Sequence, residues 1–248
     1  KVKADIGMDM PNMKFTFKDN EFGLNDLHLG FDGMIAMPDT NIDMDIKFHA
    51  KETEFKAILS LIPAVYSKDF ASVKTAGKLT LEGWAKGRYN ASQMPAFDTK
   101  LGIVNAMFKY PDLPKSVDNI NVDVVVSNPT GVLDATTIDV NQFHIEMAGN
   151  PVDLAAHIRT PISDPGIKAS LKGMIDLGSV KDIMPLEEGD ELSGIINSDI
   201  SIDGNMSALD KHEYEKFTAN GLLQVDKMDY KTNTLPYEVK LNTMKLNF

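Results

Sequence analysis

The sequence predicts a mostly β fold, a largely antiparallel sheet with one or two short helices. Three observations predict it: many segments alternate apolar and polar residues, turn-forming clusters separate them, and few stretches have helical spacing. The elongated, curved shape that we also expect follows from a family resemblance described below. Alternation alone does not say whether the apolar faces stay open or close on a second sheet. A β-sandwich is therefore the alternative fold.

The alternation is clearest where Ile42, Met44 and Ile46 are interleaved with Asp43 and Asp45. Successive strand residues point to opposite faces of a sheet, so this segment is a strand with one apolar and one charged face. The same pattern predicts further strands at Leu79 and Leu81, Ile120 to Val126, Val152 to Ile158, Ile167 to Leu171, and Ile200 and Ile202. Clusters of Asn, Asp, Gly and Pro between these segments favour turns.

Two stretches carry helical signal. The first runs from Phe55 to Ile62, with Thr53 as the predicted N-cap. Pro63 follows it, and proline ends or kinks a helix at the preceding residue. The second, shorter stretch runs from Leu177 to Ile183.

The composition excludes several function classes. The 248 residues are 43% hydrophobic and include 25 Lys and Arg against 36 Asp and Glu, a formal net charge of −11. Nucleic acids and anionic membrane surfaces both need a basic patch, so this balance argues against both as partners. The absence of cysteine excludes disulfides, thiolate metal sites and cysteine nucleophiles. The longest nearly apolar stretch, Ala57 to Tyr66, is far shorter than a membrane span.

Segments about 120 residues apart resemble one another, which predicts an internal repeat. The matching pairs, in chain order, are Leu24–Gly33 with Val140–Gly149, Ile62-Pro63 with Met184-Pro185, Leu79–Gly83 with Ile200–Gly204, Phe97 and Tyr110 with Phe217 and Tyr230, and Leu113-Pro114 with Leu235-Pro236. We therefore expect a single β domain over residues 1–248. Residues 1–96 form a partial repeat, 97–216 a full repeat, and 217–248 the start of a truncated third. The alternative is that similar strands simply look alike.

Three stretches resemble the conserved C-terminal region of the AsmA family (AsmA/TamB-like bacterial envelope proteins). They are Phe108–Pro114 with the strand that follows it, Phe143–Pro151, and Gly173–Leu177 continuing through Leu192 to Gly204. Their order of strand, Gly-Asn-Pro, strand, Gly-x-Ile-Asp-Leu, helix and strand is typical of that family. The resemblance covers about residues 95 to 235, with a divergent earlier copy before it.

The resemblance implies a periplasmic protein, attached to the inner membrane by an N-terminal anchor absent from this fragment. It also implies an elongated curved sheet with an apolar groove, and a role in outer-membrane biogenesis and phospholipid movement between the two membranes. Phospholipid is the expected partner; no cofactor is expected, and the resemblance names no protein partner. The chain begins at Lys1 and stops within an alternating run at Phe248, so we expect truncation at both ends.

The apolar faces of the predicted strands are the candidate lipid-binding site. The residues expected to line it are Ile42, Met44, Ile46, Leu79, Leu81, Ile120, Val122, Val124, Val152 and Leu154. The 14 methionines suit an adaptable apolar surface. The alternative is that these side chains form an ordinary core against a second sheet or the two helices.

Catalytic and metal sites are not indicated. Asp199, Ser201 and Asp203 approach the spacing of an EF-hand calcium loop, but Ile200 and Ile202 alternate as in a strand, which we favour. None of the five histidines has metal-ligand spacing, and catalytic-triad, phosphate-loop and dinucleotide motifs are lacking. Trp84 is expected to cap a sheet edge, with an interfacial anchor as the alternative.

The first functional hypothesis is thus a non-enzymatic envelope protein that shields or conveys phospholipid acyl chains. The second is a structural or adhesive β module that binds another protein, and a hydrolase ranks last. The direction in which the apolar faces point discriminates between the first two, because an open face favours lipid and a closed dry core favours the module.

Overall fold

The computed structural model describes residues 2–59, 73–232 and 237–248. It contains 14 strands in one sheet, and every strand pairing is antiparallel. The strands are β1 (Val2–Lys3), β2 (Ile6–Asp9), β3 (Lys14–Leu24), β4 (Leu27–Ala36), β5 (Ile42–Glu54), β6 (Lys74–Tyr89), β7 (Ala96–Lys109), β8 (Val117–Asn128), β9 (Thr137–Met147), β10 (Asn150–Arg159), β11 (Gly166–Asp176), β12 (Glu191–Asn205), β13 (Phe217–Lys231) and β14 (Val239–Asn247). The helical segments are α1 (Lys56–Leu59), α2 (Met206–Asp210) and the 3₁₀ turns η2 (Leu133–Ala135), η3 (Leu177–Asp182) and η4 (Tyr214–Lys216).

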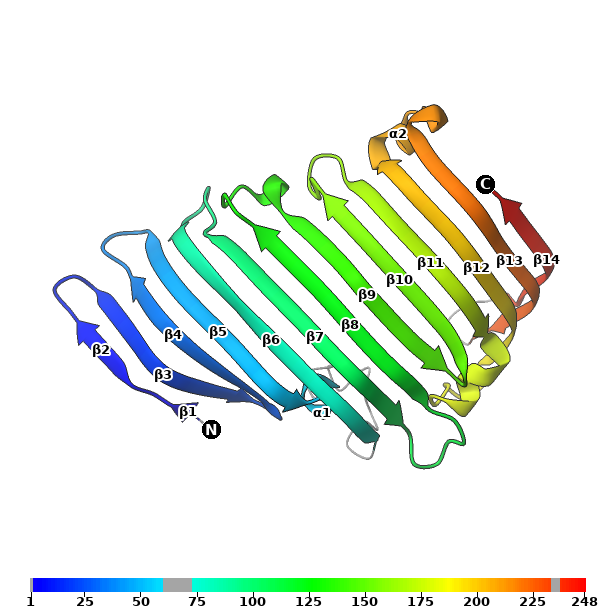
Figure 1. The fold of residues 1–248 in the computed structure, drawn as a ribbon, viewed down its shortest axis with the longest axis horizontal. Helices are drawn as coiled ribbons and strands as arrows, with labels where there is room; N and C mark the ends of the chain where they lie inside the picture. The colour runs from blue at the N-terminus through cyan, green and yellow to red at the C-terminus, as the bar shows by residue number, and fades with distance from the viewer. Residues whose placement is uncertain (1, 60–72, 233–236) are drawn as a thin grey trace.

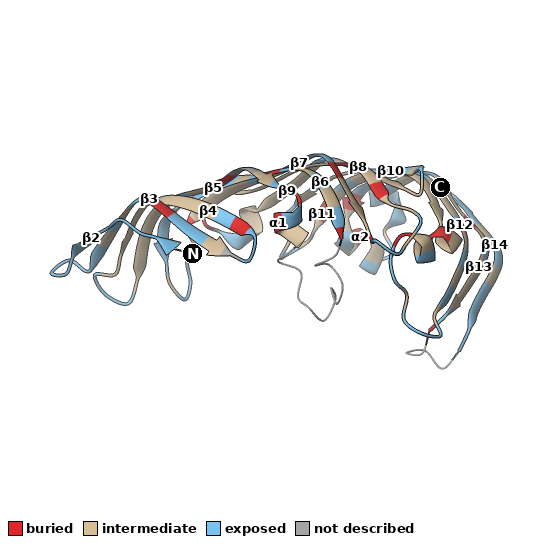
Figure 2. Cartoon of the chain, turned by 90° about the horizontal axis from the view of Figure 1, so that it is seen from below, coloured by how far each residue is buried: buried red, intermediate tan, exposed pale blue. Residues whose placement is uncertain are grey.

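From β3 to β14 each strand pairs with the next strand in the chain, and β1 and β2 share the free side of β3. The sheet is elongated, and its strands run across its long axis (Figure 1). Seen roughly along the strands, the sheet is bent into an arch (Figure 2). The predicted curved antiparallel sheet is confirmed. The β-sandwich alternative is wrong for the described residues, because all their strands belong to the same sheet.

The sequence alternation sorts side chains onto the two faces of the arch. Ile46, Ala85 and Phe97 lie opposite one another on β5, β6 and β7, and so share a face. Their neighbours Asp45 and Lys86 form an ion pair of 2.8 Å on the other face. Figure 2 shows α1 under the arch, and residues of α1 pack against the apolar face. We call the concave apolar side the inner face and the convex charged side the outer face.

Both predicted helices are present, in shorter form. Within the described residues the first covers Lys56–Leu59, and the predicted Ile62 end and Pro63 lie outside them. Thr53 as N-cap is wrong, because β5 runs on to Glu54 and Thr53 pairs with Leu79 of β6. The second helix is the 3₁₀ turn η3, and Asp176 caps it by accepting a hydrogen bond of 3.0 Å from the Gly178 amide.

The buried core is small and local. Its main cluster joins α1 and the end of η3 to the strands above them, and consists of Leu27, Ala50, Phe55, Ala57, Leu79, Ile103, Ala106, Val117, Ile120 and Ile183. Lys115, in the β7–β8 connection, holds η3 in place through contacts of 3.0 Å to Ser179 Oγ and 3.2 Å to Asp182. The accessible surface of the chain is 15069 Å², whereas a compact protein of 27.3 kDa exposes about 10,900 Å². The excess follows from a fold with one layer.

The repeat stays a prediction. Leu79–Gly83 and Ile200–Gly204 lie on β6 and β12, each the strand after a connection that contains a helical segment. A second predicted pair, Leu27–Gly33 and Val140–Met147, lies on β4 and β9. One strand separates β4 from the connection with α1, whereas two strands separate β9 from η3. The two segments therefore do not occupy equivalent positions in a repeat.

β-Bulges interrupt the pairing in the strands that bend. Register shifts fall at Asp19, Gly77, Asn105 and Asn119, and each of these residues has a positive φ. A neighbouring side chain holds two of them: the Asp19 amide donates to Asp32 Oδ1 at 2.6 Å, and the Asn105 amide to Asn121 Oδ1 at 3.0 Å. Because a bulge bends its strand and increases its twist, these positions shape the arch.

Asn105 gives a test of this assignment. Its φ of 47° lies in the left-handed region that glycine and asparagine tolerate and β-branched residues do not. We expect Asn105→Val to lower the free energy of unfolding by about 1–2 kcal/mol, and Asn105→Gly to change it by less than about 0.5 kcal/mol. Urea denaturation followed by far-UV circular dichroism measures both. Equal effects of the two substitutions would contradict a backbone origin.

Candidate functional site

All ten residues of the sequence-based candidate site lie on the inner face. The register places Leu81, Leu101 and Val124 opposite one another on β6, β7 and β8. In the next row Val122 lies opposite Phe143, which lies opposite Leu154. Ile42, Met44 and Ile46 alternate along β5 on the same side. The apolar side chains therefore form rows that run across the sheet, perpendicular to the strands.

The ten residues differ in how far other atoms cover them. Leu79 and Ile120 belong to the buried cluster above α1, with 1% and 6% of their surface exposed, and Val152 is also buried. The seven others are half-buried: Ile42, Met44, Ile46, Leu81, Val122, Val124 and Leu154. α1 and the end of η3 thus cover the inner face near one end of the central strands, and the seven half-buried residues are more open.

The structure adds a row with three alanines that the sequence analysis did not assign to the site. Ala156 of β10 lies opposite Ala169 of β11, which lies opposite Ile202 of β12 and, beyond it, Ala219 of β13. Larger residues flank this row: Ile158 and Ile167 on one side, Leu154 and Leu171 on the other. The alternation around Ala169 was visible in the sequence, but the alignment of alanines across strands depends on the register.

Two aromatic rings lie across glycines of the inner face. A Cβ at Gly83 would come within 2.5 Å of Phe48 Cζ, and one at Gly204 within 2.6 Å of Phe217 Cδ2. The rings therefore rest on backbone where a side chain is missing, and side chains at these glycines would displace them.

The outer face carries rows of paired charges. Lys168 lies 3.4 Å from Asp203, and Lys172 lies 3.3 Å from Asp199. Between these pairs, Ala155, Ser170 and Ser201 border a shallow hollow. Three further hollows are lined by charged residues together with a few apolar ones such as Trp84 and Met174. The two faces thus differ in chemistry as well as in curvature.

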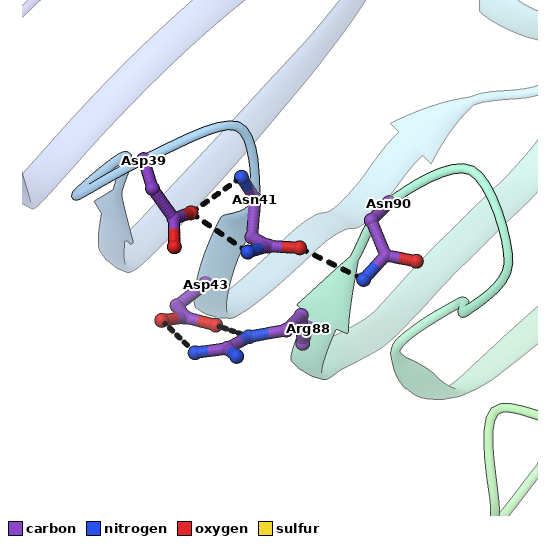
Figure 3. Close-up of polar contacts among 5 residues, drawn as sticks. All are labelled: Asp39, Asn41, Asp43, Arg88 and Asn90. Atoms are coloured by element: carbon purple, nitrogen blue, oxygen red, sulfur yellow. Dashed lines mark hydrogen bonds and ion pairs between the residues drawn. The ribbon is translucent and has the colours of Figure 1, made fainter.

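A polar cluster joins the tips of two hairpins on the same sheet (Figure 3). Asp39 accepts two hydrogen bonds of 2.7 Å from Asn41, and Asn41 Oδ1 accepts one of 2.8 Å from Asn90. Beside them Arg88 donates from Nε and Nη2 to Asp43, at 2.7 and 3.0 Å. The Asn41 backbone amide, followed by its side chain, lowers the pKa of Asp39, and the Arg88 hydrogen bond lowers that of Asp43.

Candidate catalytic and metal residues do not converge. Asp199 and Asp203 lie on β12, confirming the strand that the sequence analysis favoured, and each is paired with a lysine. His144 lies 2.7 Å from Asp153, and its Nε2 lies 3.9 Å from Glu146. His157 is paired with Asp139. Across residues 2–59, 73–232 and 237–248, no three such side chains are placed to share a metal ion.

Trp84 is not at a sheet edge, so that prediction is wrong. It lies on β6, four pairing steps from β1 on one side and with eight strands on the other. Its partners in register are Lys47 and Asp98, so its side chain belongs to the polar outer face, where it is 37% exposed. Alternation correctly placed Trp84 on the face opposite Leu81. How far Trp84 lies from a terminal strand depends on the strand order, which alternation does not predict.

No protein-family model, curated protein or solved structure matches this chain. The resemblance to the AsmA family therefore stays a prediction carried by the motifs. None of the described helical segments is long and apolar enough to cross a bilayer.

The hairpin tips at one end of the strands lie side by side, uppermost in Figure 1, and we call this row of tips the upper edge. Hydrogen bonds join adjacent tips. Asp134 of the β8–β9 connection accepts from the Ser163 amide at 3.0 Å and from Ser163 Oγ at 2.6 Å. Asp164 of the β10–β11 connection accepts from the Ser207 amide at 2.9 Å and from Ser207 Oγ at 2.7 Å. The Ser163 hydroxyl and the Ser207 amide are the largest causes that lower the pKa of Asp134 and Asp164, respectively, below the ordinary value of 3.8.

These lowered pKa values predict an acid-sensitive edge. A carboxyl with a lower pKa in the folded state stabilises that state fully above the unfolded value, and the contribution disappears as pH falls through the folded pKa. We expect the amides of Ser163 and Ser207 to lose protection from hydrogen exchange below pH 3.8, the ordinary value of both groups.

The control for this acid effect is the double variant Asp134→Asn, Asp164→Asn, which removes both titrations. Its thermal stability should fall less between pH 7 and pH 3 than that of the wild type. An equal fall in both proteins would show that these two carboxylates do not carry the effect.

Proposed function

We propose that the inner face binds the acyl chains of phospholipids, and that the protein thereby shields or conveys them without enzymatic chemistry. The observation that supports this function most directly is the half-buried apolar face that extends from β3 to β14 on a sheet with one layer. Large contiguous apolar surfaces on monomeric proteins mark interaction sites. In the bacterial envelope, as the AsmA-like motifs imply, the protein would lie in the periplasm and support outer-membrane biogenesis.

The chemistry of the inner face suits an acyl chain. Ile46, Leu81, Val124 and Leu154 offer aliphatic groups and no charge. Each methylene moved from water into such an environment contributes about 0.8 kcal/mol. Contact with several rows of the face therefore offsets part of what an acyl chain loses when it leaves a membrane. Ala156 and Ala169 are smaller than the residues in the rows beside them, which leaves room for part of an acyl chain over β10 and β11.

The charged outer face complements this function. Its ion pairs keep the outer face hydrated and disfavour the stacking of two protein molecules through that face. The net charge of −11 adds mutual repulsion between copies.

A structural or adhesive module is the second candidate, favoured by the edge strand β14. In the described sheet β14 pairs with β13 alone, so its other side offers backbone groups to a further strand. Val239 and Leu246 on this strand are each 41% exposed. Strand addition at such an edge is a recurring mode of protein recognition.

A charge on the inner face tests lipid binding. We expect the purified wild type to retain phospholipid in native mass spectrometry. Met44→Lys should retain at least about tenfold less phospholipid, because burying the lysine ammonium against an acyl chain is costly. Met34→Lys is the matched control: Met34 lies one strand away, is also half-buried, and faces outward opposite Asp45. Met44→Gln separates the effect of charge from the loss of the methionine.

Equal lipid retention by Met44→Lys and Met34→Lys would contradict the inner face as the site. A wild type that carries no lipid, and takes none up from vesicles, would overturn the proposed function in favour of the adhesive module. Far-UV circular dichroism checks that each variant keeps its sheet.

The single tryptophan gives a second test of which face binds. Trp84 lies on the outer face, and Phe97 is half-buried on the inner face of the adjacent strand. With phospholipid brominated on its acyl chains, we expect strong fluorescence quenching in the double variant Trp84→Phe, Phe97→Trp. The wild type, whose indole lies across the sheet, should be quenched much less. The reverse order would assign the acyl chains to the outer face.

A further inference from the structure

Five large apolar side chains are exposed at the tips of three adjacent hairpins. We call them the tip patch: Val132 at 61%, Leu133 at 49%, Ile162 at 68%, Met206 at 37% and Tyr214 at 61% exposure. They come from the β8–β9, β10–β11 and β12–β13 connections, which lie side by side at the upper edge of the sheet in Figure 1. Exposed apolar groups concentrated in this way mark interaction surfaces.

Hydrogen bonds hold the three tips together. Besides the Ser163 contacts, Asp134 accepts from the amide of Ile162 itself at 3.2 Å. The amide of Met206 donates to the Pro165 carbonyl at 2.9 Å, next to the bonds between Asp164 and Ser207. Two members of the patch are thus fixed through their own backbone, so less conformational entropy is lost when the patch meets a partner.

Within the β8–β9 loop, Asn128 adds rigidity. It is fully buried, its amide nitrogen donates to the Val132 carbonyl at 2.8 Å and to Thr136 Oγ1 at 2.9 Å, and its oxygen accepts from Gly131 at 2.7 Å. The loop that presents Val132 and Leu133 is therefore built around a satisfied polar centre.

The charges around the patch define the kind of surface that it fits. Asp134, Asp164, Asp210, Glu213 and Glu215 stand in these connections against Lys211 and Lys216. This excess of acids disfavours an anionic surface. Tyr214 combines an apolar ring with a polar hydroxyl, a residue type enriched where hydrocarbon meets water.

The tip patch lies next to the end of the inner face. The last aliphatic row before these tips is Ile138, Ile158 and Ile167, which lie opposite one another on β9, β10 and β11. All three are half-buried. An acyl chain that leaves a surface touching the tips would meet this row first.

We propose that the tip patch docks on the uncharged surface of a phospholipid bilayer, with Leu133 and Ile162 as its central contacts. The role of this contact, to bring acyl chains to the upper end of the inner face, rests on the proposed function. The docking itself depends only on the exposed side chains and the hydrogen bonds that fix them.

Flotation with phosphatidylcholine vesicles tests the docking. We expect the wild-type chain to float with the vesicles, and Leu133→Asp, Ile162→Asp to bind at least about tenfold more weakly, since both substitutions place a charge in the apolar interface. Met184→Asp is the matched control, because Met184 is 47% exposed in the β11–β12 connection at the opposite edge. It should float like the wild type, and added phosphatidylglycerol should weaken binding of all three proteins.

Two results would overturn the docking: a wild type that stays unbound, or equal flotation of the wild type and the Leu133→Asp, Ile162→Asp variant. A wild type that fails to float but binds a protein through these tips would replace the bilayer with a protein partner.

Lipid retention measured by native mass spectrometry separates this inference from the proposed function. Met44→Lys should lose retained lipid and still float. Leu133→Asp, Ile162→Asp should fail to float and still retain lipid delivered from a cyclodextrin complex. A wild type that retains lipid but does not float would overturn the docking of the tip patch alone. A wild type that floats but retains no lipid would overturn the proposed function alone.

Discussion

The fold depends on one constraint: among the described residues, no second sheet covers the apolar face of the first. In a sandwich the two inner faces bury each other, and the stability of the domain comes from that contact. Here α1 and η3 cover the ends of a few central strands, and the cluster around Leu79 and Ala106 is the main closed core among the described residues. Elsewhere the strands depend on pairing with their neighbours and on cross-strand contacts within each face. The same openness that limits the core leaves apolar surface available for a ligand.

Local interactions compensate for the thin core. Bulges with left-handed residues such as Asp19 and Asn105 curve the sheet, so side chains on the concave side approach one another. Hydrogen-bonded carboxylates and amides at the upper edge connect each hairpin to the next, as Asp164 does with Ser207. Charge pairs on the outer face add little energy singly, but they keep that face polar where they lie, on β5 and β6 and on β11 and β12.

The sequence predicted the antiparallel sheet and the division of its faces, because period-two alternation is a local property of each strand. The expectation of a curved sheet came from the AsmA-like motifs and not from the alternation. It also placed Met44, Val122 and Leu154 on a common face before any register was known. Sequence did not predict which of the ten residues would be covered, since burial of Leu79 and Ile120 depends on where α1 and η3 fold back. The position of Trp84 within the sheet and the alignment of Ala156 with Ala169 depend on strand order and register, which single-strand patterns do not contain. The exposed tips were not predictable from sequence, because Leu133 and Ile162 are distant in the chain and are brought to neighbouring hairpins only by the strand order.

The meander topology has a consequence for how such proteins change over evolutionary time. From β3 to β14 each strand has contacts almost entirely with its immediate neighbours, so the arch is a one-dimensional array of hairpins. Duplication or loss of one hairpin preserves the pairing on both sides and alters only the span. The length of the apolar path can therefore be adjusted in steps of two strands, without redesigning a core.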